Sequence, residues 1–129
     1  PHGLELSNDF LIYENSHLAG AAPVGTDVPH HPGRYSVSMA VSTEVPLAKS
    51  LHAQLVKRGF NITGMLGFSD SQPLPISWGE ILPLSFVNAS FRASGRRLPP
   101  VVVMSVPYRR FNESAAMVPE MLGLGAAVA

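Results

Sequence analysis

The sequence contains no cysteine in its 129 residues, which excludes disulfide bonds, thiolate zinc sites and a cysteine nucleophile. It also lacks an excess of charge of either sign, because nine basic residues balance nine acidic ones. We therefore expect no broad positive field, and neither nucleic acid nor a membrane as a partner. No uninterrupted apolar stretch is long enough to span a bilayer, which favours a soluble, cytoplasmic protein.

The composition that remains is that of a folded chain. Apolar residues make up 46% and charged residues 14%, which argues against disorder. Twelve prolines and eleven glycines are spread along the sequence and are not gathered into a linker, so they punctuate short elements. The length suits one hydrophobic core. We therefore predict a single domain over residues 1–129, or a segment of a larger one.

The clearest elements are a strand and a helix in the first half of the chain. Residues 34–41 alternate larger apolar side chains with small or polar ones, the period of a half-buried strand. Residues 44–58 carry leucines spaced by four, with Pro46 in the first turn and Gly59 after the last turn. These patterns predict a strand followed by a helix that packs one face on a sheet.

The second half continues in the same style. Residues 60–65 are typical of a short strand, and the apolar run VVVMSV at 101–106 predicts a strand buried on both faces. Residues 114–129 predict a helix that Pro119 either interrupts or begins. The alternation of strands and helices predicts the α/β class, as a layered sheet with helices packed on both faces.

Several segments have no clear period. Residues 7–33 form a long irregular segment, in which residues 10–13 are a candidate short strand. A loop of this length in a compact domain is usually functional. Residues 66–80 resemble a loop, residues 81–86 either a short helix or an irregular segment, and residues 92–100 a basic, turn-rich connection.

Three pieces of the chain stand in an order that is known from one family. They are PHG at the start, LAKSLHAQLVKRGFNI at 47–62, and SWGEILPLSFV followed by PPVVVMSV. They resemble three motifs of the class III extradiol ring-cleavage dioxygenases, catalytic B-subunit type. The first resembles the SPH that ends an early strand of that family, and the second resembles its helix leading to a Gly-Phe-Asp-like strand. The third resembles its pattern of Asp-His-Gly, then VPL, then Pro-Val-Val-x-x-Ser-Val. The order agrees from Pro1 to about Leu124.

The resemblance implies a dioxygenase B-subunit-like fold that is incomplete at both ends in this chain. It implies a non-haem Fe(II), or zinc in some members, at the carboxyl edge of the sheet, and extradiol cleavage of a catechol-type ring with O2. Imidazole and carboxylate ligands suit that chemistry because they leave metal positions open for substrate and O2.

Carried over by position, His2 matches the second metal-binding histidine of the family. The other two ligands of the family fall outside residues 1–129. Its acid/base histidine falls on Trp78, whose indole does not titrate. Loss of a positioned acid or base costs about a hundred- to ten-thousand-fold in rate. Glu80, two residues later, is the candidate to replace it.

Each candidate also has a structural interpretation. His2 either binds a metal or lies in a frayed terminus. Trp78 either covers an aromatic ligand or, the alternative we favour, anchors its loop in the core. Glu80 becomes a useful base only if burial or a neighbouring charge shifts its pKa, so we expect an exposed loop carboxylate. Arg109 and Arg110 follow the buried strand and are candidates for contacts with a substrate anion.

The remaining candidates are arginines and histidines outside the motifs. Arg96 and Arg97 either clamp a carboxylate or, as we favour, lie in a solvated turn. We expect His52 at the edge of the apolar stripe of its helix. Three further histidines are expected in the solvated long loop: His17, His30 and His31.

Three functions are compatible with these residues. The leading hypothesis is an extradiol dioxygenase-like protein acting on a small aromatic substrate, with a homo-oligomer or a second chain completing the site. The second is a non-catalytic interaction or scaffold member of the same fold, indicated by Trp78. The third is a tautomerase that uses the amine of Pro1 as its base, which we rank last because the chain lacks the paired β-α-β pattern of such enzymes.

Overall fold

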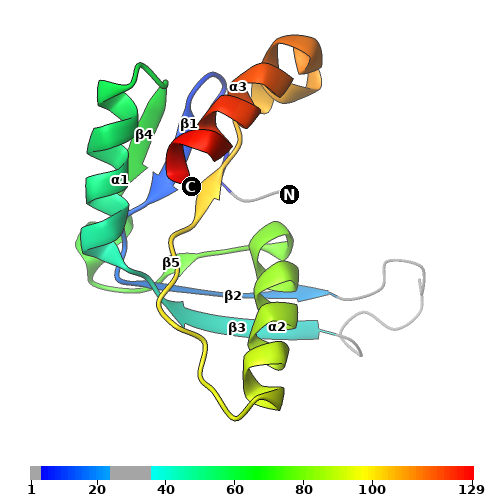
Figure 1. The fold of residues 1–129 in the computed structure, drawn as a ribbon. Coiled ribbons are helices and arrows are strands. Elements are labelled where there is room, and N and C mark those ends of the chain that lie inside the picture. The colour runs from blue at the N-terminus through cyan, green and yellow to red at the C-terminus, as the bar shows by residue number, and fades with distance from the viewer. Residues whose placement is uncertain (1–3, 24–35) are drawn as a thin grey trace.

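Residues 4–23 and 36–129 are described by a computed structural model (Figure 1). Within these residues the protein is mixed α/β, with two three-stranded sheets, three α-helices and two short 3-10 helices. The predicted α/β class is confirmed. The strands divide between two sheets, however, and do not form the single layered sheet that we expected. None of the described helices is both long enough and apolar enough to cross a membrane.

The first sheet has the strand order β4-β1-β6. Strand β1 (Phe10–Tyr13) pairs in parallel with β4 (Ile62–Met65) and antiparallel with β6 (Met104–Ser105). All four residues of β1 are buried. The candidate short strand at residues 10–13 is therefore confirmed, and it is the central strand of this sheet.

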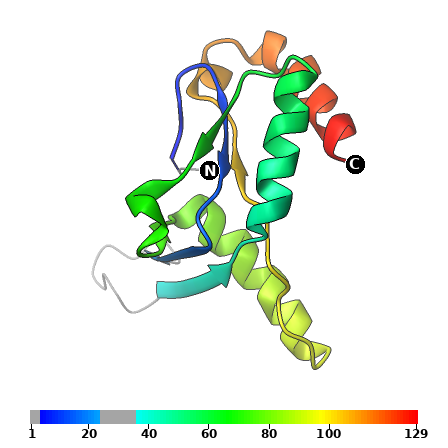
Figure 2. The same ribbon diagram turned by 90° about the vertical axis from the view of Figure 1, so that its left-hand side faces the viewer.

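The two faces of β1 enter two different parts of the core. Phe10 and Ile12 pack with helix α1 (Val45–Lys57) and helix α3 (Ser114–Val128). Figure 2 shows these two helices on the same side of the first sheet. The opposite face of β1, with Tyr13, packs toward the second sheet. Side chains alternate along a strand, so one short strand supports both clusters.

The second sheet has the strand order β3-β2-β5. Strand β2 (His17–Pro23) pairs antiparallel with β3 (Ser36–Ser42) and in parallel with β5 (Leu74–Pro75). Helix α2 (Trp78–Ala93) packs on this sheet, and its buried Ile81 joins the strand residues of one cluster. The other face of β3 carries small side chains that are exposed: Ser36, Ser38, Ala40 and Ser42.

Helix α1 and strand β4 agree with the prediction to within two residues at each end. Pro46 lies in the first turn of α1, where a missing amide hydrogen costs nothing, and Lys57 lies in the last turn. Gly59 follows with φ of 87°, a left-handed conformation that favours glycine and ends the helix. The proline in the first turn, the periodic apolar residues and the terminating glycine together explain why helix α1 was predicted correctly.

Strand β2 contradicts the prediction of an irregular segment. Its sequence, HLAGAAP, holds only small side chains apart from its first two residues, so it has no visible period of two. Gly20 is required there because a Cβ would collide with the backbone carbonyl of Ile76. Residues 24–33 of the predicted loop lie outside the described residues.

Two corrections concern prolines inside helices. Helix α2 begins at Trp78 and continues through Pro83 to Ala93, although we expected a loop to residue 80 and at most a short helix after it. Helix α3 begins at Ser114, so Pro119 neither interrupts nor starts it. In both helices the proline is the sixth residue, in the second turn, so it removes the one backbone hydrogen bond that its amide would donate to the carbonyl four residues earlier.

The expected buried strand at residues 101–106 is mostly not a strand. Val101 forms an isolated parallel bridge with Thr43, beside the second sheet, and only Met104–Ser105 pair with β1 in the first sheet. All six residues are only partly buried. The segment crosses from one sheet to the other, and a chain that changes partners cannot form one continuous ladder.

Candidate functional site

An apolar pocket of about 370 Å³ lies where β1 and β4 of the first sheet end. In open α/β sheets, ligands bind at the carboxyl ends of the parallel strands, and the volume of this pocket suits a small molecule. The lining comes from three separate segments of the chain, namely Leu4, then Met65, Gly67 and Phe68, then Leu74 and Pro75. This is the edge of the sheet at which the resemblance places the dioxygenase site.

The loop over this pocket has an unusual backbone. Phe68, Ser69 and Asp70 have φ values of 54°, 48° and 61°, the left-handed region, although none is glycine. Each costs about 1 kcal/mol or more, so other contacts must hold the loop in place. Phe68 is 51% exposed and presents a ring at the mouth of the pocket.

Two residues that follow β1 hold this loop. The buried Asn15 donates from Nδ2 to the carbonyl of Gly67 at 2.7 Å and accepts from its amide at 2.8 Å. The amide of Ser16 donates to Oδ1 of Asp70 at 2.7 Å, which is the main reason that the pKa of that carboxyl is lowered. The loop is thus fastened to the end of β1 at both of its ends.

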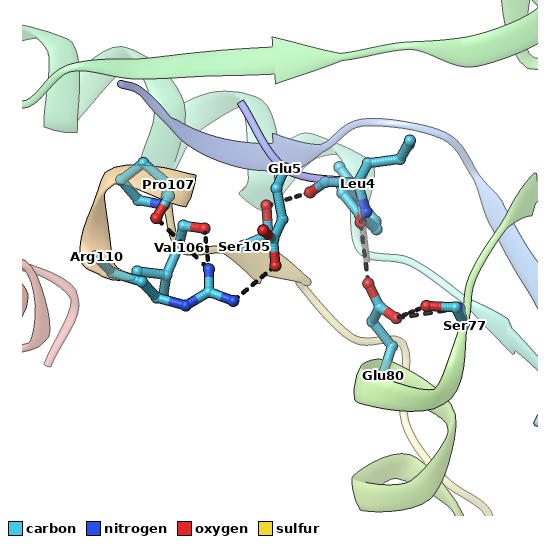
Figure 3. Close-up of polar contacts among 9 residues, drawn as sticks. Leu4, Glu5, Ser77, Glu80, Ser105, Val106, Pro107 and Arg110 are labelled. Carbon is cyan, nitrogen blue, oxygen red and sulfur yellow. Dashed lines mark hydrogen bonds and ion pairs between the residues drawn. The ribbon is translucent and has the colours of Figure 1, made fainter. Parts of the chain in front are cut away.

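A chain of hydrogen bonds joins the pocket wall to the first turn of α2. The amide of Leu4 donates to the hydroxyl of Tyr13 at 3.1 Å, and that hydroxyl donates to Oε1 of Glu80 at 3.0 Å. Figure 3 shows Glu80 between Leu4 and Ser77. Burial of Tyr13, and second the charge of Glu80, raise the pKa of this hydroxyl far above its ordinary value, so it remains a neutral donor.

Glu80 has a structural role that the expected exposed loop carboxylate would not have. The amide of Ser77 donates to its Oε2 at 3.1 Å, and together the two residues form a capping box at the start of α2. Glu80 is partly buried and lies in the first helical turn. Both of its carboxylate oxygens already accept hydrogen bonds.

Trp78 is the first residue of α2 and is 42% exposed. The expectation that it anchors a loop in the core is therefore wrong. It stands three residues after Pro75, which lines the pocket, and next to the capping serine. The position that the resemblance assigns to the acid/base histidine thus lies at a helix start, and Trp78 is not among the residues that line the pocket.

Arg109 and Arg110 both point at carboxylates of the protein itself. Arg109 Nη2 lies 2.6 Å from Glu120 Oε2, and Arg110 Nη2 lies 2.7 Å from Glu5 Oε1. Arg110 also donates to the carbonyl of Val106 at 2.8 Å (Figure 3). A substrate anion would have to displace these carboxylates, so the arrangement serves to fasten the segment before β1 and helix α3.

The histidines are dispersed. His2 lies outside the described residues, as do Pro1, His30 and His31. His17 is exposed, as expected, but it begins strand β2 and does not lie in a loop. His52 is half-buried at the edge of the α1 stripe, as expected, with Nδ1 2.9 Å from Glu14 Oε1.

The residues around the pocket do not fit Fe(II) or zinc. In residues 4–23 and 36–129, histidine, aspartate and glutamate nowhere gather in a group of three or more that could hold a metal ion. The pocket lining is apolar apart from backbone groups and the Met65 thioether, whereas these metals take imidazole, carboxylate or thiolate ligands.

Sequence reasoning did not single out Tyr13, Asn15 or Phe68. One available signal was the Ser-x-x-Glu spacing of residues 77–80, which marks a capping box and so the start of a helix. Asn15, directly after a short apolar strand, carried a weaker signal. Nothing in the sequence around Phe68 indicates a left-handed backbone.

No protein-family model matches this chain, and a search of curated proteins finds no match to it. The dioxygenase resemblance therefore depends on the ordered motifs alone.

Proposed function

We propose that this chain is an extradiol dioxygenase-like protein that binds a small catechol-type aromatic molecule in the apolar pocket, and that its described residues bind the ring without cleaving it. One observation supports this most: the pocket lies at the carboxyl ends of β1 and β4. Trp78, to which the resemblance assigns the position of the family's acid/base histidine, begins α2 three residues after the pocket residue Pro75.

The lining suits an aromatic ring. Phe68 offers a half-exposed ring for edge or offset contacts, and Met65 offers a thioether, which makes favourable contacts with aromatic edges. Leu74 and Pro75 form an apolar wall. Binding would remove this apolar surface from water, which is the main source of affinity in such a site.

The two candidate catalytic residues, Trp78 and Glu80, are not suited to proton transfer. The indole of Trp78 does not titrate, and Glu80 accepts hydrogen bonds from Tyr13 and Ser77 that a role as base would disrupt. This supports the non-catalytic hypothesis over ring cleavage by the described residues.

Ring cleavage is the second candidate, because Leu4, two residues after His2, lines the pocket. An Fe(II) or zinc ion would also need ligands that the described residues do not offer, and a second copy or another chain would have to supply them.

Binding is tested by titrating catechol into the protein under argon and following the fluorescence of Trp78, the single tryptophan. We expect saturable quenching, and an affinity about fivefold weaker for Phe68→Ala because an aromatic contact is lost. Phe86→Ala is the matched control, since Phe86 is an exposed phenylalanine that does not line the pocket. Equal affinities of the two variants would contradict the proposed pocket.

Ring cleavage is tested separately, by oxygen consumption with catechol after incubation with Fe(II) or zinc, together with elemental analysis. We expect neither a stoichiometric metal nor oxygen uptake in the wild type or in Trp78→His. Oxygen uptake that increases in Trp78→His, with one iron per chain, would favour the second candidate.

A further inference from the structure

A second cavity, of about 540 Å³, lies beside the outer edge of β3 near the carboxyl end of α2. It is polar, unlike the first pocket. Its walls are strand β3 on one side and, on the other, the last turns of α2 and the connection that follows: Ser38, Met39, Ala40, Val41, Ser42, Asn88, Arg92, Arg96, Arg97, Leu98, Pro99 and Pro100. We call it the arginine groove.

Three arginines line this groove. None of them forms an ion pair with a carboxylate in residues 4–23 or 36–129, whereas Arg109 and Arg110 do. All three are exposed. Such an excess of positive charge in a concave surface attracts a negatively charged ligand.

The end of α2 fixes where these arginines lie. The amide of Arg96 donates to the carbonyl of Phe91, and that of Gly95 donates to the carbonyl of Arg92. This Schellman motif turns the chain back, with Gly95 at φ of 71°. The guanidinium of Arg96 then lies over the ring of Phe91, 4.9 Å from its centre. The turn that we expected at Arg96 and Arg97 is present, and both side chains are exposed, as expected.

The opposite wall is the edge of a sheet. Strand β3 is at the end of its sheet, and the carbonyl of Ser42 accepts from the amide of Val101 on its outer side. Backbone groups alternate between the two edges of a strand, so those of Ala40 and Ser38 also point outward. In the described residues no backbone hydrogen bond joins residues 97–100 to these two residues.

Two prolines explain why the edge stays open. The short parallel pairing that begins at Val101 would continue backward through Pro100 and Pro99, but proline has no amide hydrogen to donate. The chain leaves β3 at this point, and the groove occupies the space between them. An unpaired strand edge is a site at which an extended peptide can add as a new strand.

We infer that the arginine groove binds an acidic peptide in extended conformation, which pairs with the edge of β3 and places carboxylates against Arg92, Arg96 and Arg97. Charge complementarity selects the acidic side chains, and the open edge selects an extended backbone over a compact anion. A peptide of about four or five residues would span Ser38–Ser42. This inference is independent of the proposed function, since it uses neither the apolar pocket nor Trp78.

The test uses the full chain and a fluorescein-labelled peptide of alternating Glu and Val, followed by fluorescence polarisation. Two control peptides carry Lys in place of Glu, or Pro in place of Val. We expect saturable binding of the acidic peptide and at least about tenfold weaker binding of both controls, which lose either the charge or the backbone donors. Equal binding of the proline peptide would overturn strand pairing.

A matched pair of variants locates the site. Arg92→Gln with Arg96→Gln should weaken the acidic peptide about tenfold, because two exposed ion pairs are lost. Lys49→Gln with Lys57→Gln removes the same charge from exposed positions of α1, outside the groove, and should leave the affinity unchanged. Equal losses in both double variants would contradict the groove as the site.

Hydrogen exchange provides a test without any substitution. Bound peptide should slow exchange of the Ser38 and Ala40 amides and leave those of β1 unchanged. Unchanged exchange at both residues under saturating peptide would overturn the inference. So would inorganic phosphate that binds as tightly as the peptide, or a single-stranded RNA that binds more tightly.

Discussion

The two ends of helix α2 differ in how their polar groups are used. At the first turn, Glu80 accepts hydrogen bonds from Ser77 and Tyr13, and Tyr13 in turn accepts one from Leu4 in the segment before β1. At the last turn, Arg92 lines the arginine groove and forms no ion pair within the described residues. The same helix therefore has one end whose polar groups are satisfied within the fold and one whose charges are available. Polar groups of the first kind stabilise the protein, and those of the second kind are candidates for binding.

The strongest test of this difference is Ile81→Ala, near the first turn. Ile81 is fully buried against the second sheet, so we expect a loss of about 2–5 kcal/mol in the free energy of unfolding. Urea denaturation measures it. Phe86→Ala on the same helix is 75% exposed and should change stability by less than about 0.5 kcal/mol. Similar losses would mean that the packing of α2 differs from the structure.

The next largest loss of stability is expected for Tyr13→Phe, which removes only the hydroxyl between Leu4 and Glu80. We expect a loss of about 1–2 kcal/mol, since the amide of Leu4 and the carboxylate each lose a partner. Urea denaturation at pH 7 measures it. An unchanged stability would show that these groups are equally well solvated without the hydroxyl.

Tyr13 also predicts a dependence on pH. Its pKa is raised in the folded state, so its stabilising contribution is complete below the unfolded value of about 10 and decreases as the pH rises above it. The reason is that the unfolded chain ionises first. The stability difference between wild type and Tyr13→Phe should therefore shrink between about pH 9.5 and pH 11. A constant difference over this range would contradict the assignment.

A smaller loss is expected from Ser77→Ala at the same end of the helix. Removing a capping side chain typically costs about 1 kcal/mol. Ser94→Ala, at the C-terminal end of α2, is the control, since its exposed hydroxyl bonds only to carbonyls within its own helix. Thermal unfolding would show a lower midpoint for Ser77→Ala than for Ser94→Ala. The reverse order would contradict the capping box.

The smallest effect on stability is expected for Arg92→Gln with Arg96→Gln, below about 0.5 kcal/mol. These exposed side chains contribute little to the fold, although their loss should weaken peptide binding. Urea denaturation of this double variant beside wild type measures the change. A loss comparable to that of Tyr13→Phe would mean that the arginines support the structure, and the contrast between the two ends of α2 would disappear.

Local patterns in the sequence were sufficient to predict the elements whose periodicity and end residues lie within the element itself. Helix α1 has a periodic stripe and a glycine stop, and β1 has a short apolar run. Trp78 begins α2 three residues after Pro75, which lines the pocket, and its assignment to a site stays a prediction from the resemblance.

Features that depend on distant partners could not be read from the sequence. Strand β2 is defined by its pairing with β3 and not by its small side chains. The left-handed loop at Phe68 is held by Asn15 and Ser16, about fifty positions earlier in the chain. Residues 101–106 have the composition of a continuous strand, yet they divide their pairing between two sheets.

That division has a consequence for the order of folding. Strands β2 and β3 are near neighbours in the chain, whereas Ile12 of β1 pairs with Met104, close to the opposite end. Contacts between distant residues carry a larger loop-closure cost and form later. Since residues 101–105 connect the two sheets, we expect the second sheet to gain protection first and β1 only when this late segment arrives. Pulse-labelled hydrogen exchange would show that sequence, and simultaneous protection would show that both sheets form in one step.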